Sequence, residues 1–92
     1  MTDIAVRATP TSDGWTCDVD VNDANGSRTQ HHVRVTHADL QRLSPGADGP
    51  EELVRRSFEF LLAREPQESI LRSFDLPVIG RYFPDYERQI RR

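Results

Sequence analysis

The first third of the chain alternates apolar and polar residues with a period of two. The alternation is strongest over residues 15–22 and recurs more weakly over residues 4–8 and 29–36. A period of two is typical of strands that bury one face. The pattern therefore predicts three strands. The apolar positions that define them are Ile4, Val6, Ala8, Trp15, Cys17, Val19, Val21, Val33 and Val35.

The turn between the second and third predicted strands decides which residues share a face. Asn25 and Gly26 suggest a two-residue turn, but that register would place the valines of the two strands on opposite faces. A type I turn over residues 23–26, with Gly26 in the left-handed conformation, returns them to one face. This turn predicts that Cys17 lies opposite Val33 and Trp15 opposite Val35.

The residues after the strands carry signals of helices. Thr36 with Asp39 three residues later predicts a capped short helix that ends at Leu43. Residues 44–50, rich in glycine and proline, predict a loop. Pro50 then suits the first turn of a longer helix over residues 51–65, whose dipole the acidic residues 51 and 52 complement.

The predicted helix over residues 51–65 has an unusually wide apolar side. On a helical wheel the apolar residues and Ser57 fill an arc of about 200°, opposite Glu52, Arg55, Arg56 and Glu59. So wide an arc predicts contacts on two sides. One contact is with the sheet, and the other is either with the C-terminal segment or with a second copy of the chain.

The C-terminal segment predicts short helices. Pro66 ends the long helix, and Ile70, Leu71 and Phe74 indicate a short amphipathic helical turn. Asp75 is expected to cap a helix over residues 76–83, which Pro84 ends, and residues 85–90 add a last turn. We therefore expect a single α+β domain over residues 1–92, a three-stranded antiparallel meander followed by one amphipathic helix and short C-terminal helices. Its expected core is Trp15, Cys17, Val19, Val33, Val35, Val54, Phe58, Leu61, Leu62, Ile70, Phe74 and Ile79.

The composition limits the partners and the cellular location that the sequence predicts. The 92 residues carry a net charge of −3, and all 12 basic residues are arginine, so no overall field attracts nucleic acid or anionic membranes. The single cysteine excludes an internal disulfide. No apolar run is long enough to span a bilayer, and the polar first residues are unlike a signal peptide. We expect a cytoplasmic protein without membrane contact.

The residue types that most often carry chemistry lie in unfavourable positions. His31 and His32 are neighbours on a strand, so they point to opposite faces and do not share a metal ion. Cys17 lies on the apolar face, where a cysteine is usually an inert core residue. The glycines form no phosphate-binding pattern. We therefore expect no catalytic, metal-binding or cofactor-binding residues, and no enzymatic activity.

The last dozen residues combine aromatic and arginine side chains, which are enriched where proteins bind partners. The candidate partner surface consists of Arg81, Tyr82, Tyr86, Arg88 and Arg91. The alternative is a C-terminal helix that docks on its own domain. The leading hypothesis is a non-enzymatic interaction module, a small adaptor or regulatory subunit that acts through an unidentified protein partner or through self-association. The second hypothesis is a nucleic-acid-binding regulator or antitoxin-like protein, suggested by the exclusive use of arginine as the basic residue and by the arginine-rich C-terminus.

Residues 58–87, from Phe58-Glu59-Phe60 through Tyr82-Phe83-Pro84 to Glu87, resemble the C-terminal half of a family of small bacterial proteins of unknown function. Those proteins also begin with a β-meander that carries a tryptophan and a glycine-containing hairpin. The resemblance implies the fold and brings no activity with it. The order of three strands and an amphipathic helix is also similar to antitoxins of bacterial toxin–antitoxin pairs, which is a likeness of fold alone.

Overall fold

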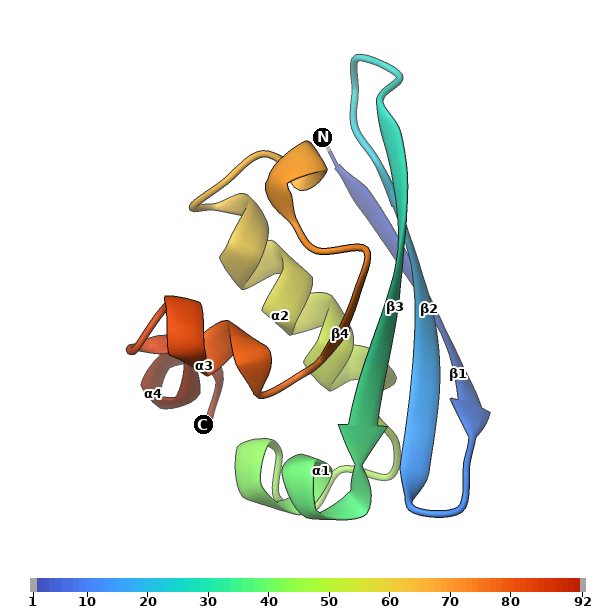
Figure 1. Cartoon of the computed structure of the whole chain (residues 1–92), viewed down its shortest axis with the longest axis vertical. Helices are drawn as coiled ribbons and strands as arrows, with labels where there is room; N and C mark the ends of the chain where they lie inside the picture. The colour runs from blue at the N-terminus through green and yellow to red at the C-terminus, as the bar shows by residue number, and fades with distance from the viewer. Residues whose placement is uncertain (1, 92) are drawn as a thin grey trace.

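A computed structural model describes residues 2–91 and has an α+β fold. Three antiparallel strands form the predicted meander, and a short fourth strand pairs in parallel with the third, which gives a mixed sheet in the order β1-β2-β3-β4. The strands are β1 (Asp3–Pro10), β2 (Gly14–Asn22), β3 (Arg28–Thr36) and β4 (Ser73–Asp75). The helices are α1 (His37–Leu43), α2 (Glu51–Leu62), the 3₁₀ helix η1 (Gln67–Ser69), α3 (Val78–Tyr82) and α4 (Tyr86–Ile90). The helices lie on one side of the sheet (Figure 1).

The predicted register of the meander is confirmed. Cys17 lies opposite Val33 and Trp15 opposite Val35. Gly26 adopts a φ of 88°, and the Asp23 carboxylate accepts hydrogen bonds from the N–H groups of Asn25 (2.9 Å) and Ser27 (2.8 Å). The carboxylate thus fixes the turn that keeps the valines of both strands on the buried face.

The predicted cap of α1 is also confirmed. The Thr36 hydroxyl accepts a hydrogen bond from the Asp39 N–H (3.0 Å), and the Asp39 carboxylate accepts one from the Thr36 N–H (3.1 Å). This reciprocal pair satisfies two of the donors that a helix leaves free at its first turn. It turns the chain from the end of β3 directly into α1.

The long helix is shorter than the sequence predicts. It ends at Leu62 rather than at residue 65. Pro66 disfavours the helical conformation at Glu65, so the helix could not have reached residue 65 with regular geometry. The N–H groups of Arg64 and Glu65 both bond to the Leu61 carbonyl, each at 2.9 Å, and close the helix with a tight turn.

The prediction for residues 70–75 is wrong. We expected a helical turn with Asp75 as a cap, but residues 73–75 form β4 against β3. The His32 N–H donates to the Arg72 carbonyl (2.7 Å) and the Leu76 N–H to the Arg34 carbonyl (3.0 Å). The Asp75 carboxylate instead accepts a hydrogen bond from Arg34 Nε (2.5 Å). The backbone of β3 therefore determines the conformation of this segment.

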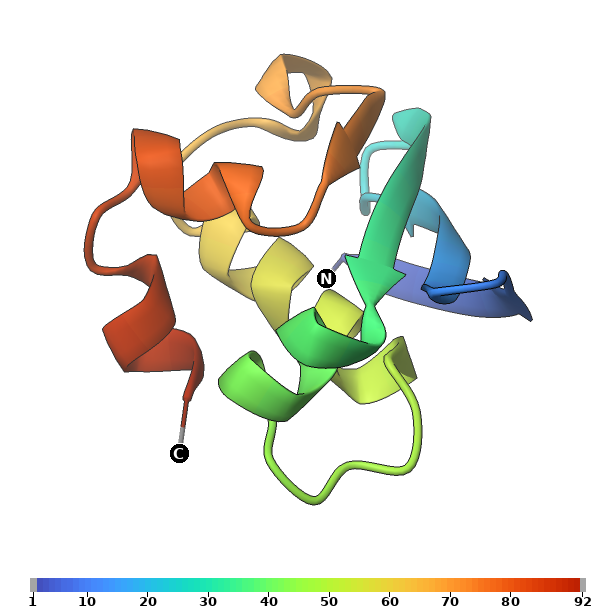
Figure 2. The ribbon, with the colours of Figure 1, turned by 60° about the horizontal axis from the view of Figure 1, so that its bottom comes forward.

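The wide apolar arc of α2 is covered by the chain itself. The sheet covers one side of the helix, and α4 lies on the side away from the sheet (Figure 2). The Phe58 ring lies 5.1 Å from the His31 ring, whereas the Phe60 ring lies 5.3 Å from the Tyr86 ring. Covering the arc therefore requires no second copy of the chain.

The expected core is largely confirmed, with two corrections. Trp15 and Leu62 are only partly buried. Trp15 lies near the end of the sheet, where the centroid of its ring is 4.6 Å from that of the His37 ring in an edge-to-face arrangement. The core also includes residues beyond the expected set. These are Val21, Leu40, Leu43, Leu53, Phe60, Leu76, Tyr86 and Ile90.

Candidate functional site

The structure divides the predicted partner surface. Arg81, Tyr82, Arg88 and Arg91 are exposed, and Tyr82 keeps 67% of its surface accessible. Tyr86 is fully buried, so its inclusion in the surface is wrong. The two tyrosines are four residues apart, but Tyr82 ends α3 whereas Tyr86 begins α4 and points toward α2.

Tyr86 has a structural role in the closure of α2. Its hydroxyl lies 2.7 Å from Ser57 Oγ, and the Ser57 hydroxyl donates to the Leu53 carbonyl (2.8 Å). Tyr86 therefore donates to Ser57. Burial raises the pKa of Tyr86 to about 12, so its hydroxyl stays protonated at neutral pH. Ser57 lies inside the apolar arc of α2 because a small polar residue there leaves room for the tyrosine.

An apolar groove lies beside α3, between that helix, the end of α2 and the segment that leads into β4. Its volume is about 390 Å³. We call it the α3 groove. Eight of its ten lining residues are apolar or aromatic, and Leu71 (47% exposed) and Tyr82 (67% exposed) leave much of their surface open to solvent. The lining residues are Leu61, Glu65, Ser69, Ile70, Leu71, Phe74, Val78, Ile79, Tyr82 and Phe83.

The predicted arginines lie outside this groove. Arg81 lines a second hollow of about 550 Å³, on which Trp15, Arg34 and Asp75 also border. Arg88 and Arg91 line neither hollow. Of the predicted surface, only Tyr82 belongs to the α3 groove. Leu71 was not among the predicted site residues, because the sequence analysis assigned it with Ile70 and Phe74 to the apolar side of a helical turn, and the pattern does not distinguish the exposed Leu71 from the buried Ile70.

A buried polar network holds one wall of the α3 groove against the sheet. His31 Nδ1 donates to the Leu71 carbonyl (2.8 Å), which leaves Nε2 to accept from the Thr29 hydroxyl (2.9 Å). Gln67 Nε2 donates both to Thr29 Oγ1 (3.2 Å) and to the Val21 carbonyl (3.1 Å). The network joins β2 and β3 to the segment of residues 67–71, so the groove wall has a fixed position.

Acidification is expected to weaken this network. Burial lowers the pKa of His31, so the unfolded chain binds the proton more readily than the folded protein. The His31 contribution is therefore complete above the unfolded pKa of about 6.5 and is lost as the pH falls below it, by at most about 1.4 kcal/mol per pH unit. Urea unfolding at pH 7.5 and 5.5 measures the free energy of unfolding of the wild type and of His31→Gln. Between these pH values the wild type should lose more free energy of unfolding than the variant, which lacks the titrating imidazole. Equal pH dependence of the two proteins would contradict it.

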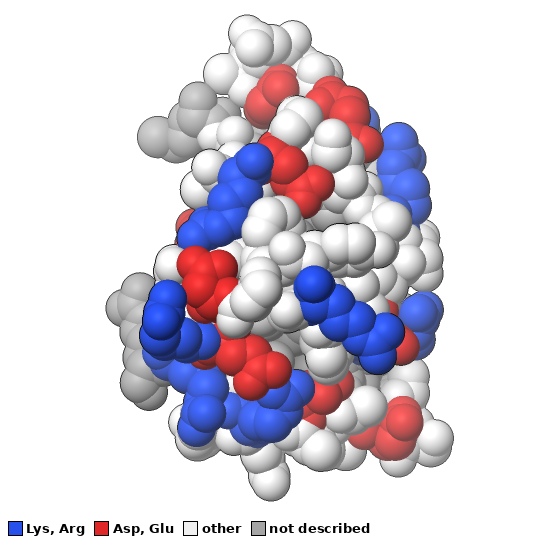
Figure 3. Space-filling view, turned by 60° about the vertical axis from the view of Figure 1, so that its left-hand side comes forward, with Lys and Arg blue, Asp and Glu red and all other residues white. Residues whose placement is uncertain are grey.

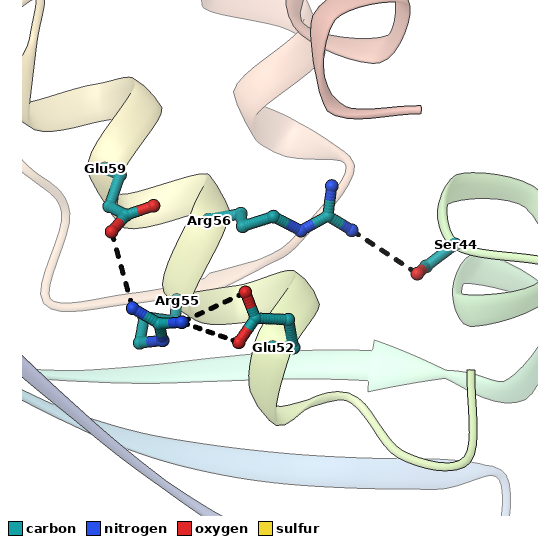
Figure 4. Close-up of polar contacts among 5 residues, drawn as sticks. All are labelled: Ser44, Glu52, Arg55, Arg56 and Glu59. Atoms are coloured by element: carbon teal, nitrogen blue, oxygen red, sulfur yellow. Dashed lines mark hydrogen bonds and ion pairs between the residues drawn. The ribbon is translucent and has the colours of Figure 1, made fainter. Parts of the chain in front are cut away.

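Many of the charged side chains form ion pairs or hydrogen bonds with one another. On the outer side of α2, Arg55 lies between Glu52 (2.7 Å) and Glu59 (3.5 Å), and Arg56 reaches Ser44 Oγ (3.4 Å) (Figure 4). Arg56 also donates to the Ile90 carbonyl (2.9 Å), which ties α4 to α2. On the face shown in Figure 3, arginine side chains gather at the lower left, and acidic side chains lie between and beside them. These contacts make the arginines of α2 part of the fold.

The residue types that could carry chemistry lie apart from one another. Cys17 is fully buried, and burial raises the pKa of its thiol to about 11, so the nucleophilic thiolate is scarce at neutral pH. His31 is buried in the polar network, whereas His32 lies on the outer face and contacts Asp18 (2.6 Å). Within residues 2–91, no three His, Cys, Asp or Glu side chains are grouped so as to hold a metal ion.

No helix within residues 2–91 is long and apolar enough to cross a bilayer. The cytoplasmic location stays a prediction.

Comparison with known proteins identifies no related protein. No protein-family model matches the chain, and neither a curated protein nor a solved structure matches it. The resemblance of residues 58–87 to small bacterial proteins of unknown function therefore stays a prediction.

Proposed function

We propose that this protein is a non-enzymatic interaction module that binds an apolar segment of a protein partner in the α3 groove. The observation that carries the proposal is the exposure of Leu71 and Tyr82 around an apolar hollow. They are the large apolar side chains that remain exposed within residues 2–91. On a small protein, such residues around a concave surface mark a binding site more often than scattered exposure does.

The size and chemistry of the groove suit side-chain insertion. Its volume of about 390 Å³ falls in the range of roughly 300–1,000 Å³ that is usual for binding pockets. Burial of Leu71 by a partner would contribute on the order of 1 kcal/mol, because half of a side chain worth about 1.5–3 kcal/mol is already buried. Inserted partner side chains add a contribution of their own. A partner with one or two large aliphatic or aromatic residues therefore fits the groove.

A carboxylate indicates the charge of the partner. Glu65 is the charged residue among those that line the groove, and it forms no ion pair with any residue in the range 2–91. Opposite charges across an interface favour encounter and fix orientation. We therefore expect the bound segment to carry a lysine or arginine beside its apolar residues.

Selection from a library of random twelve-residue peptides tests the proposal. We expect the recovered peptides to combine apolar residues with a basic one, and to bind Leu71→Asp at least about ten-fold more weakly than wild type, since about 1.4 kcal/mol is lost. Ala38→Asp introduces the same charge on the exposed side of α1 and is the matched control. Ala38→Asp should keep the wild-type thermal unfolding midpoint. Leu71→Asp loses the buried half of the leucine side chain and should lower the midpoint by about 4–8 °C while the protein stays folded.

Three results would contradict the proposal. They are the recovery of no peptide family, equal binding by Leu71→Asp and wild type, or equal loss in Leu71→Asp and Ala38→Asp. The nucleic-acid hypothesis rests on the exposed Arg81, Arg88 and Arg91. It predicts instead that the protein binds a DNA or RNA duplex with an affinity that falls steeply with salt and does not depend on Leu71.

A further inference from the structure

We infer that the partner segment binds in an extended conformation, as a fifth strand on the free edge of β4, with alternate side chains in the α3 groove. This inference rests on the proposed function and names the binding mode. Addition of a strand to a sheet edge is a recurrent mode of peptide recognition, in which the backbone contributes affinity and side-chain pockets contribute specificity.

The hydrogen bonds of β4 show which backbone groups face away from β3. In the parallel ladder the Arg72 carbonyl and the Leu76 N–H bond to β3, and Phe74 lies between them with its backbone directed the same way. The N–H and carbonyl groups of Ser73 and Asp75 therefore point to the opposite side. Within residues 2–91, no other backbone or side-chain group hydrogen-bonds to them. Two donors and two acceptors on this edge are thus without a hydrogen-bond partner within residues 2–91.

The α3 groove lies on that same side of β4. Its lining extends from Ile70 and Phe74, in and before β4, to three residues of α3. These are Val78, Ile79 and Tyr82. In Figures 1 and 2, β4 has β3 on one side and the helical layer on the other. A chain paired with Ser73 and Asp75 would therefore lie along the mouth of the groove.

A strand added to the edge of β4 could place its side chains in the α3 groove, because side chains alternate between the two faces of a strand. In β4, Phe74 is buried and lines the groove, whereas Ser73 and Asp75 are exposed on the outer face. Side chains of an added strand alternate in the same way. Every second residue of the bound segment would point inward, beside Phe74, and the residues between them would face solvent. The expected partner sequence is apolar at alternate positions, with a cation at the end that reaches Glu65.

The other edge of the sheet lacks this combination. β1 is longer, with eight residues, and it too has a free edge. However, neither the α3 groove nor the hollow beside Arg81 is lined by any residue of β1. Pro10 also supplies no N–H at its end. Specific recognition is therefore expected at β4.

Backbone methylation of a designed peptide tests the inference. The probe is Ac-Lys-Thr-Leu-Thr-Leu-Thr-Lys-NH₂, in which the lysines and leucines share one face of a strand, titrated into the ¹⁵N-labelled full chain. Two further versions carry N-methyl groups either on both leucines or on the first two threonines. Only every second amide of an added strand points toward β4. We expect one version to bind at least about ten-fold more weakly, through the loss of two hydrogen bonds, and the other to bind within about two-fold of the parent.

The methylation pattern also reports the strand orientation. The outward groups of β4 belong to residues on the outer face, so an antiparallel strand uses its threonine amides and a parallel strand its leucine amides. In either case the amide signals of Ser73 and Asp75 should shift. Leu71→Asp should weaken binding of the parent peptide, and Ala38→Asp should leave it unchanged.

The outcomes separate this inference from the function on which it rests. Equal affinity of all three peptides, or shifts confined to β1, would overturn strand addition. So would failure of the designed peptide while library peptides with helical spacing of their apolar residues bind in a Leu71-dependent way. The proposed function would survive that last result. If neither the designed nor the library peptides bind, the proposed function fails and the inference with it.

Discussion

Replacement of Phe58 by alanine is expected to destabilise the protein by about 3–5 kcal/mol. Phe58 is fully buried, and its ring lies 5.1 Å from the His31 ring and 6.2 Å from the Phe74 ring. It therefore connects α2 to β3 and to β4. A domain of this length has a total stability of about 5–14 kcal/mol, so this variant should be close to the limit of folding.

Urea unfolding followed by circular dichroism measures this effect. Phe58→Leu is the matched control, because it keeps most of the apolar volume and should lose about 1–1.5 kcal/mol. The cavity should also loosen β4, since Phe74 would lose one of its neighbours. A loss below about 1 kcal/mol for Phe58→Ala would contradict the central position of this ring.

The second large effect is expected from Tyr86. Tyr86→Ala removes a fully buried ring that lies 5.3 Å from the Phe60 ring, and it should cost about 3–5 kcal/mol. The same substitution uncovers the side of α2 that faces away from the sheet. Exposure of this apolar side should increase self-association, which size-exclusion chromatography with light scattering detects.

Two milder variants separate packing from hydrogen bonding at this position. Tyr86→Phe and Ser57→Ala each break the 2.7 Å hydrogen bond and should each cost about 1 kcal/mol. The double variant should cost less than the sum, because neither partner is then left unsatisfied. If Tyr86→Ala is as stable as wild type, α4 does not cover α2.

The predicted partner surface should be tested by point substitutions rather than by deletion of residues 84–92. The deletion would also remove the fully buried Tyr86 and so disturb the fold.

The parts of the fold that local signals determine were predictable. The alternation of apolar residues, the parity of the turn at Gly26 and the Thr36 cap act over a few residues, so the sequence contains them in full. The strand β4 is different. Three residues carry no recognisable period. Their extended conformation depends on hydrogen bonds between residues 72–76 and His32 and Arg34 of β3, which only the complete fold brings together.

The candidate site was predictable only in part. Aromatic and arginine content pointed to residues 81–91, and Tyr82 does lie at the groove. The same signal failed at Tyr86, because composition does not distinguish an exposed tyrosine from a buried one. Ser57, a polar residue within the apolar arc of α2, was the available hint that a buried hydroxyl lies opposite. The groove itself depends on segments up to 22 residues apart, from Leu61 to Phe83, and no local pattern indicates it.

The most direct test of the account is a methyl NMR titration of the full chain with the strongest peptide from the library selection. The account predicts that the largest shifts fall on the methyl groups of Leu61, Ile70, Leu71, Val78 and Ile79, which line the α3 groove. Those of Ile4 and Val6 on β1 should stay unchanged. Shifts that are largest on β1, or spread evenly over the core, would contradict the assignment of the groove as the binding site.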